Sequence, residues 1–226
     1  MRETVRVASV RPAAGGGRWV DVDPERLPAW LNGFAVRHGG YRITGVDEAL
    51  RLSSGDGVTL GLWAPPGATL PATAPEDIDG FVTDALAERR IGLLLARQAS
   101  VAVGIAQGPR LLASKVDTYY VQSRTAAGGW SQQRYARRRA NQAKAAAESA
   151  AEIAVRLLLP ELDRLAALVT GGDRRTVEAI LGEPQLAPVR PLVSPRLLAV
   201  GEPRQAVLEE AAVLARRVRI LVHDPA

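Results

Sequence analysis

The chain has 226 residues, of which 47% are hydrophobic and 23% charged, and its formal net charge is +5, a composition typical of a globular protein with a buried core. It contains no cysteine and only two histidines, His38 and His223, far apart in the sequence, so a disulfide scaffold, a thiol nucleophile and a cysteine-based zinc site are excluded and no metal site is expected. No segment has the length of a transmembrane helix and no signal-peptide core is present, so we expect a cytoplasmic protein without a membrane partner.

Residues 1–75 are predicted to form a small α+β unit with several short strands and a helix. Asp23 stands before a proline, which is typical of a helix start with the aspartate at the N-cap. Trp30 and Phe34 follow at helical spacing, and such a pair is typical of a packed core rather than of a stacking site. The stretch 64–76 has four prolines and no periodicity, so we place a linker and the domain boundary there and expect no catalytic group before it.

Residues 76–226 are predicted to form a second domain of α/β type. Apolar runs separated by short polar turns indicate a strand meander, which leads into an alanine-rich helix and then into alternating strands and helices. The elements expected are, in order, a helix over 78–89, strands over 91–96, 100–106, 110–116 and 118–123, a helix over 131–158, a strand over 165–170, a helix over 174–181, a strand over 197–200, a helix over 203–216 and a strand over 218–222. This order predicts a mixed sheet with flanking helices.

The turn Gly171-Gly172-Asp173 lies between an expected strand and an expected helix and has two interpretations. It could cradle a phosphate at the start of the helix. It could also be a tight strand-to-helix turn with Asp173 as the N-cap, which is the interpretation that we favour.

Residues 118–147 carry the excess positive charge of the chain. They hold six basic residues and no acidic one, so this segment contributes +6 whereas the whole chain has +5. The basic residues are Arg124, Arg134, Arg137, Arg138, Arg139 and Lys144. Trp130 and Tyr135 lie among them, and arginine beside aromatic residues is typical of a surface that binds RNA or DNA. The alternative is a solvated amphipathic helix with a basic face, which the glycine pair, the two glutamines and the lack of compensating acids disfavour.

The letters GGWSQQRYARRR, residues 128–139, resemble the loop-and-helix signature of the catalytic middle domain of archaeal and eukaryotic class-1 peptide-release factors. In that signature a Gly-Gly-Gln tripeptide precedes a serine, an Arg-aromatic-Ala-Arg segment and a long helix. Gly128 and Gly129 match the glycines, but Trp130 stands at the position of the family's glutamine. In this departure the segment resembles the Vms-like branch, the release-factor-like peptidyl-tRNA hydrolases of ribosome quality control. The chain resembles an actinobacterial-type member of that branch. The resemblance covers roughly residues 90–226 and implies a ribonuclease-H-like domain.

The resemblance implies that a glutamine of the glycine loop, 125–133, is catalytic. The Gly-x-x-Gln motif of the branch selects Gln132, and the doubled glutamine leaves Gln133 as a rival that the sequence does not exclude. A neutral amide cannot act as a general base near neutral pH, but it can orient a water, and its backbone N–H can stabilise an oxyanion. The two glycines would let the loop approach RNA closely. Trp130 would either stack on a base or pack back onto the domain.

The activity that the resemblance implies is codon-independent hydrolysis of peptidyl-tRNA, which releases nascent chains from stalled or split ribosomal complexes. The partners would be the rRNA of the large ribosomal subunit and peptidyl-tRNA, without a small-molecule cofactor, and the arginines of the helix would bind rRNA phosphates. The alternative is a non-catalytic module that binds rRNA or tRNA through the same basic helix. An α/β scaffold with an incidental basic loop is a third interpretation. A metal-dependent nuclease, with Asp117, Glu148 and Asp173 as candidate ligands, is poorly supported because no acidic residue lies close to the loop.

Overall fold

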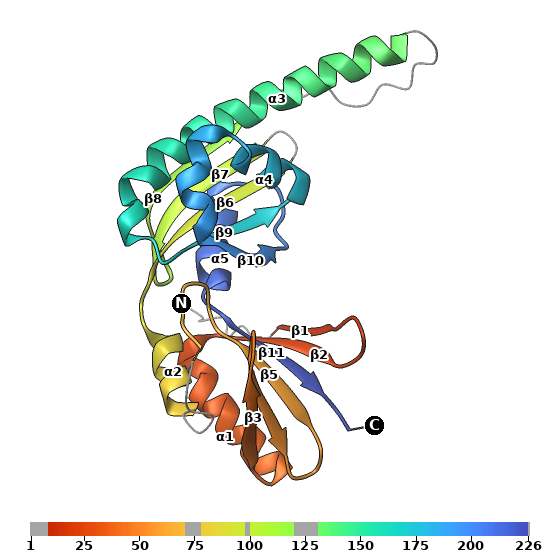
Figure 1. The fold of residues 1–226 in the computed structure, drawn as a ribbon, viewed down its shortest axis with the longest axis vertical. Coiled ribbons are helices and arrows are strands. Elements are labelled where there is room, and N and C mark those ends of the chain that lie inside the picture. Colours follow the sequence, from red (N-terminus) through yellow and green to blue (C-terminus); the bar gives the residue numbers. More distant parts are fainter. Residues whose placement is uncertain (1–8, 71–77, 98–99, 120–130, 226) are drawn as a thin grey trace, which may run out of the picture. The chain divides into compact units, whose positions relative to one another are not determined.

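The computed structural model describes residues 9–70, 78–97, 100–119 and 131–225, with Ser9 and residues 131–140 described by their backbone alone (Figure 1). The chain forms two compact units. The first unit comprises residues 1–88 and 216–226, and the second comprises residues 89–215. Among the described helices, none is long and apolar enough to cross a membrane.

The first unit is built on a six-stranded sheet in which all neighbouring strands are antiparallel. In order across the sheet, the strands are β1 (Ser9–Pro12), β2 (Arg18–Val22), β11 (Val218–His223), β5 (Thr59–Trp63), β4 (Leu50–Ser54) and β3 (Tyr41–Val46). The helices are α1 (Leu27–His38) and α2 (Ile78–Leu86), and the short 3-10 helix η1 (Pro24–Arg26) leads into α1. Figure 1 shows both α-helices on the same face of the sheet.

The core of the first unit lies between this face of the sheet and the two helices. Phe34 of α1 and Phe81 of α2 are buried against apolar side chains that alternate along the strands, such as Leu62 and Ile220. Trp30 is partly buried against the same core, and its ring stacks on Phe34 with the centroids 5.8 Å apart. The prediction that this aromatic pair belongs to the core is therefore confirmed.

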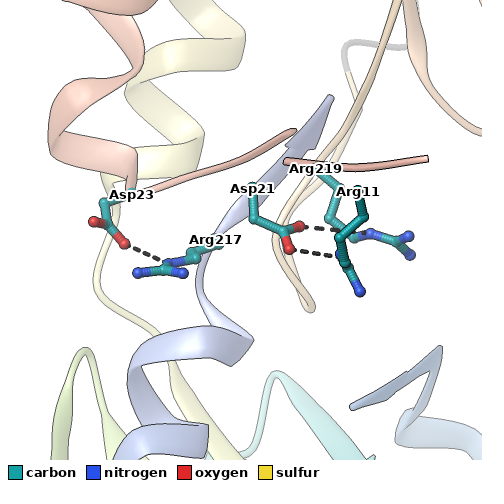
Figure 2. A network of polar contacts seen from close by, with 5 residues as sticks. All are labelled: Arg11, Asp21, Asp23, Arg217 and Arg219. Carbon is teal, nitrogen blue, oxygen red and sulfur yellow. Dashed lines mark hydrogen bonds and ion pairs between the residues drawn. The ribbon is translucent and has the colours of Figure 1, made fainter. Parts of the chain in front are cut away.

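Strand β11 comes from the end of the chain but lies inside the N-terminal sheet, hydrogen-bonded to β2 on one side and to β5 on the other. Figure 2 shows the polar contacts that accompany this insertion. Asp21 of β2 accepts a hydrogen bond from Nη2 of Arg11 at 2.8 Å, and its other carboxylate oxygen lies 3.7 Å from Nε of Arg219 in β11. Asp23 accepts a hydrogen bond from Nε of Arg217 at 2.7 Å. Asp21 and Asp23 therefore hold Arg219 within β11 and Arg217 directly before it.

The carboxylate of Asp23 has a different role from the predicted one. Asp23 occupies the N-cap position of η1, but its side chain makes no capping hydrogen bond there. The predicted N-cap position is therefore confirmed, but the side chain does not cap the helix. The carboxylate accepts a hydrogen bond from Arg217 instead, and a charge-assisted hydrogen bond to a buried guanidinium is stronger than a bond to a neutral backbone amide.

The division of the chain into two units differs from the boundary predicted near residue 75. Residues 76–88 and 216–226, predicted as parts of the second domain, belong to the first unit. Helix α2 buries Phe81 and Ala85 in the core of the first unit, and β11 completes its sheet. Pairing between strands that are distant in the sequence leaves no local signal, so the sequence pattern assigns β11 to the domain that immediately precedes it.

The second unit has a five-stranded mixed sheet in the order β10-β9-β6-β7-β8. The strands are β6 (Arg90–Arg97), β7 (Ser100–Gln107), β8 (Arg110–Thr118), β9 (Ala167–Gly172) and β10 (Val193–Leu198). Strands β6, β7 and β8 form an antiparallel meander, whereas β9 lies parallel to β6 and β10 parallel to β9. This is the ribonuclease-H-like arrangement, and the predicted mixed α/β sheet with flanking helices is confirmed.

Helices cover both faces of this second sheet. Helices α3 (Ser131–Leu158) and α4 (Arg174–Leu181) cover one face, with the 3-10 helices η2 (Leu159–Arg164) and η3 (Pro184–Leu192), and α5 (Gln205–Ala215) covers the other. The alternation along β7 follows these layers: Val101 and Val103 pack in the cluster that contains α3, and Ala102 packs in the cluster that contains α5. The strands β6, β7 and β9 are thus buried on both sides, whereas the edge strand β8 is largely exposed.

The turn between β9 and α4 is a capped strand-to-helix turn. Gly172 has a φ of +95°, and a Cβ atom there would lie 2.3 Å from the carbonyl oxygen of Ala96. The Asp173 carboxylate accepts hydrogen bonds from the backbone N–H of Thr176 at 2.8 Å and from its hydroxyl at 3.0 Å. The first of these bonds is the main reason why the pKa of Asp173 lies below its ordinary value. The favoured interpretation of Gly171-Gly172-Asp173 is confirmed, since Asp173 is the cap.

Replacement of Arg217 tests the attachment of β11. We expect Arg217→Met to lower the free energy of unfolding by about 1.5–3 kcal/mol, because it removes a hydrogen bond between two charged groups at a site where the arginine is 6% exposed. Arg216 is the matched control, since it pairs with a Glu25 side chain that is 57% exposed, and Arg216→Met should cost less than about 1 kcal/mol. Urea unfolding followed by circular dichroism measures both values, and equal losses would contradict the role of burial.

The cap on α4 makes a prediction about pH. Asp173→Ala should lower the free energy of unfolding by about 1 kcal/mol at neutral pH, because the helix loses its N-cap. The folded-state pKa of Asp173 lies below 3.8, so the stabilisation by the carboxylate is complete above 3.8 and is lost as the pH falls through the lowered pKa. The difference in the free energy of unfolding between wild type and Asp173→Ala should therefore become smaller in acid. A difference that stays constant down to the lowest pH at which the protein folds would show that the charge does not matter.

Candidate functional site

Helix α3 positions the candidate site. It has 28 residues and is about 42 Å long at roughly 1.5 Å per residue. Its bounds, Ser131 and Leu158, agree with the helix predicted from the sequence, because the segment is rich in alanine, contains no glycine or proline and is followed by Pro160. Figure 1 shows that the beginning of α3 extends beyond the sheet that the rest of the helix covers.

The C-terminal part of α3 is anchored in the core of the second unit. Buried residues recur at helical spacing on one side of the helix: Ala147, Ala150, Ala151, Ile153, Ala154 and Leu158. Their small side chains let the helix lie close to the sheet, and at Gly92 of β6 an added Cβ atom would lie 2.9 Å from a methyl group of Leu158. Among the described side chains of α3, which begin at Asn141, none before Ala147 is buried. The helix is therefore fixed at its C-terminal half.

The predicted catalytic glutamines lie at the beginning of this helix. Gln132 and Gln133 are its second and third residues, and the arginines follow in the next two turns. The arginines are Arg134, Arg137, Arg138 and Arg139. Gly128, Gly129, Trp130 and Arg124 lie outside the described residues. Of the loop predicted over 125–133, the last three residues are thus helical.

Lys144 is the one predicted RNA-binding residue whose side chain is described. It is 75% exposed, and its Nζ lies 3.7 Å from Oε1 of Glu148, one turn further along the helix. An exposed pair at this spacing contributes only a few tenths of a kcal/mol, about 0.3–0.5. The pairing still offsets the charge of Lys144, so Lys144 contributes less to a positive surface than its place in the sequence indicates.

Tyr119 marks the point at which the chain leaves the sheet toward the loop. Strand β8 ends at Thr118, so the strand predicted over 118–123 contributes at most its first residue to the sheet, and 120–123 lie outside the described residues. Tyr119 packs against the core that holds α3. Burial, assisted by the negative charges of Asp117 and Glu152, raises the pKa of Tyr119 to about 12. This phenol stays neutral at physiological pH and ties the entrance of the loop to α3.

The three acidic residues considered as metal ligands are each engaged locally. Asp117 accepts a hydrogen bond from the N–H of Thr118, Glu148 pairs with Lys144, and Asp173 caps α4. Within the described ranges, no group of three or more His, Cys, Asp or Glu side chains is arranged to hold a metal ion. The structure does not bring these three carboxylates together into a site.

Comparisons with solved structures find partial likenesses, and among curated proteins none matches. The archaeal translation termination factor aRF1 is 18% identical over 56% of this chain and 37% of its own, with a TM-score of 0.40. A structure described as an archaeal protein is 16% identical over 73% of this chain and 51% of its own, with a TM-score of 0.37. S. cerevisiae Dom34, described as a translation termination-like factor involved in RNA quality control pathways and interacting with Hbs1, is 8% identical over 90% of this chain and 66% of its own, with a TM-score of 0.35. The chain thus spans less than two thirds of the length of each.

A family match covers more than half of the chain. Residues 89–221 match the family described as Actinobacteria/chloroflexi VLRF1 release factor. The matched region contains all of α3 and the segment 128–139, whose letters resemble the release-factor signature. The resemblance to an actinobacterial type of release-factor-like protein is confirmed by this match. The chain belongs to the actinobacterial and chloroflexi VLRF1 release-factor family.

Proposed function

We propose that the protein is a codon-independent peptidyl-tRNA hydrolase that releases nascent chains from stalled or split ribosomal complexes. Its partners are the rRNA of the large ribosomal subunit and peptidyl-tRNA. Membership of a release-factor family supports this class of reaction, since release of a nascent peptide is the hydrolysis of its ester bond to tRNA.

The observation that carries the proposal is the position of Gln132 and Gln133 on α3. They lie in the first turn of the helix, and about 22 Å of helix at roughly 1.5 Å per residue separates Gln132 from Ala147, the first described residue of α3 that is buried. An anchored rod that carries its reactive groups at the opposite end suits a substrate that lies deep in a narrow cavity. The peptidyl-tRNA ester on the large subunit is such a substrate.

The reaction needs a water and a place for negative charge. Water attacks the carbonyl carbon of the ester, the bond to the 3′-oxygen of the tRNA breaks, the peptide leaves as a carboxylic acid and the 3′-oxygen takes up a proton. A glutamine amide orients this water through hydrogen bonds. The first backbone N–H groups of an α-helix have no partner within the helix and carry partial positive charge, so the start of α3 supplies donors for the developing oxyanion or the leaving oxygen.

The remaining residues of the segment bind and position. Gly128 and Gly129 allow close approach of the backbone to RNA, and Trp130 stacks on a base or docks the loop. The four arginines after the glutamines bind rRNA phosphates, for which the planar guanidinium is suited as a bidentate donor. Arg124 adds to this surface, and Lys144 adds less because Glu148 offsets its charge. The rest of the catalytic environment comes from the rRNA around the ester.

The first test is single-turnover release of labelled peptide from purified 50S–peptidyl-tRNA complexes. Wild type should release peptide, and Gln132→Ala should lower the rate by about 100-fold, the loss typical of one oriented hydrogen-bonding group. Gln142→Ala is a matched control on the same helix, since the Gln142 side-chain oxygen is buried without a hydrogen-bond partner in the described structure and its loss should leave release unchanged.

The outcomes of this test separate the alternatives. Loss of release in Gln133→Ala with full activity in Gln132→Ala would assign the catalytic role to Gln133 instead of Gln132. Full activity in both variants and in the double variant would contradict the glutamine mechanism. No release by wild type, with 50S binding retained, would leave a non-catalytic module that binds rRNA or tRNA.

The dependence of 50S binding on salt tests the basic surface. Each phosphate contact made by a cation contributes about 0.7–0.9 to the slope of log affinity against log salt. Changing all four arginines, Arg134, Arg137, Arg138 and Arg139, to glutamine should therefore reduce this slope by about three. Lys144→Gln is the control and should change the slope by clearly less than about one, because Glu148 already offsets its charge. Binding that keeps its slope in the fourfold variant would place the ribosome contact elsewhere.

A further inference from the structure

One face of the sheet in the first unit is not covered by any described helix of that unit. Helices α1 and α2 lie on the opposite face (Figure 1). The register places alternate side chains of neighbouring strands together on the open face, in rows that run across the sheet. The large or charged side chains at these positions are Arg11, Trp19, Asp21, Arg42, Arg51, Trp63, Arg219, Leu221 and His223.

Two tryptophans and two arginines form a continuous cluster on this open face. The rings of Trp19 in β2 and Trp63 in β5 meet edge to face, with centroids 4.9 Å apart. The guanidinium of Arg219 lies 4.2 Å from the centre of the Trp19 ring, and that of Arg51 lies 5.1 Å from the centre of the Trp63 ring. The four side chains are only partly buried. Planar aromatic and guanidinium groups are thus held side by side at the surface of a rigid sheet.

Backbone and counter-charges fix the orientation of these planes. At Gly61, between Arg51 and Trp63, a Cβ atom would lie 2.7 Å from the Trp63 ring and 2.9 Å from the Arg51 guanidinium, so the glycine makes room for both planes. Asp21 is 5% exposed and holds the guanidinium of Arg11 at 2.8 Å (Figure 2). Asp47, in the turn before β4, binds Nε of Arg51 at 3.1 Å. The platform is organised before any ligand binds.

The open face is positively charged. Its strand positions hold four arginines, Arg11, Arg42, Arg51 and Arg219, against the carboxylate of Asp21, and Asp47 before β4 pairs with Arg51, so these six groups sum to +2. Asp21 is almost fully buried between two of these arginines, so its charge is not presented to solvent. Arg11 and Arg42 are exposed. Such a face is complementary to a polyanion.

We propose that the open face of the first unit binds single-stranded RNA, with bases stacked on the tryptophan–arginine cluster and phosphates on Arg11 and Arg42. Bases stack on aromatic rings and on guanidinium planes, and cations beside them follow the backbone, which is the pattern of sequence-tolerant single-strand binding. An acidic protein segment would use the arginines but would gain nothing specific from two partly exposed indole rings. The combination therefore favours RNA.

This binding surface is independent of the proposed hydrolase activity, because it lies in the first unit whereas the glutamines lie on α3 in the second. Loss of peptide release in a glutamine variant leaves the surface unaffected. Loss of RNA binding in a tryptophan variant likewise leaves the glutamine mechanism untested, so the two proposals can fail separately.

The test uses the full chain with Arg134, Arg137, Arg138 and Arg139 changed to glutamine, which removes the basic segment of α3 as a competing RNA site. The probe is a fluorescein-labelled oligouridine of about twelve nucleotides, a length within the range of single-strand sites, and binding is followed by fluorescence anisotropy. Trp19→Leu and Trp63→Leu should each weaken binding by about tenfold, because each removes a stacking plane. Circular dichroism of the parent and of each tryptophan variant verifies that the protein folds.

Arg42→Gln keeps the proposal testable if a tryptophan variant does not fold, since Arg42 is exposed and supports no core contact. It should reduce the salt slope of RNA binding by about 0.7, the contribution of one phosphate contact to a single strand. Arg37→Gln is the matched control, because Arg37 is exposed on α1, on the covered side of the sheet, and the slope should not change.

Two outcomes would overturn the proposal. In the first, the tryptophan variants bind RNA with the same affinity as the parent, and Arg42→Gln and Arg37→Gln have equal slopes of log RNA affinity against log salt. The other is binding of polyglutamate or polyphosphate that equals RNA binding and depends equally on the tryptophans, which would make the face a site for acidic protein segments or for charge alone.

Discussion

The structure depends on the insertion of β11 between β2 and β5. This strand satisfies the backbone hydrogen bonds of two strands that would otherwise be edges, and arginines on and beside it bind Asp21, Asp23 and Glu25. The first unit is therefore complete only when the last residues of the chain have joined the first ones. The second unit is contiguous, so its contacts are closer in sequence and have a smaller cost of loop closure.

Within the second unit, the packing of the C-terminal half of α3 on the sheet determines where the helix begins. The alanines from Ala147 onward let the helix pack closely on the sheet, and Leu158 fills the space that Gly92 leaves. An α-helix is stiff over this length, so the anchored half defines the direction of the other half without further contacts. The glutamines that we propose as catalytic would need no pocket of their own at the start of such a helix, because the rRNA around the substrate would supply the walls. This is consistent with glutamines that lie in a first helical turn rather than among convergent acidic or histidine side chains.

Features that depend on local sequence patterns could be predicted from the sequence. Features that depend on pairing between distant segments could not. The bounds of α3 and α4 and the cap at Asp173 were predictable, because helix propensity, breakers and caps act within a few residues. The place of β11 and the partner of Asp23 were not, because nothing near residue 23 indicates an arginine nearly two hundred residues later. The family could be recognised from residues 128–139, and the start of the helix among them could be predicted too. The open face of the first unit could not, since β2, β4, β5 and β11 come from four separate segments, and only their register brings Trp19 and Trp63 together.

Net charge is a poor guide to where positive charge collects on this protein. The segment 118–147 contributes +6 to a chain of +5, so the remaining residues sum to −1, and yet the open face of the first unit is positive. The two surfaces obtain their charge differently. In α3 the arginines follow one another in the sequence without acids between them. In the first unit each central guanidinium is held by an indole ring and a carboxylate, so little side-chain entropy is lost on binding and the geometry of the planes, rather than the number of charges, determines what fits. Under the two proposals, a surface of the first kind would select for charge density, and one of the second kind would select for flat bases.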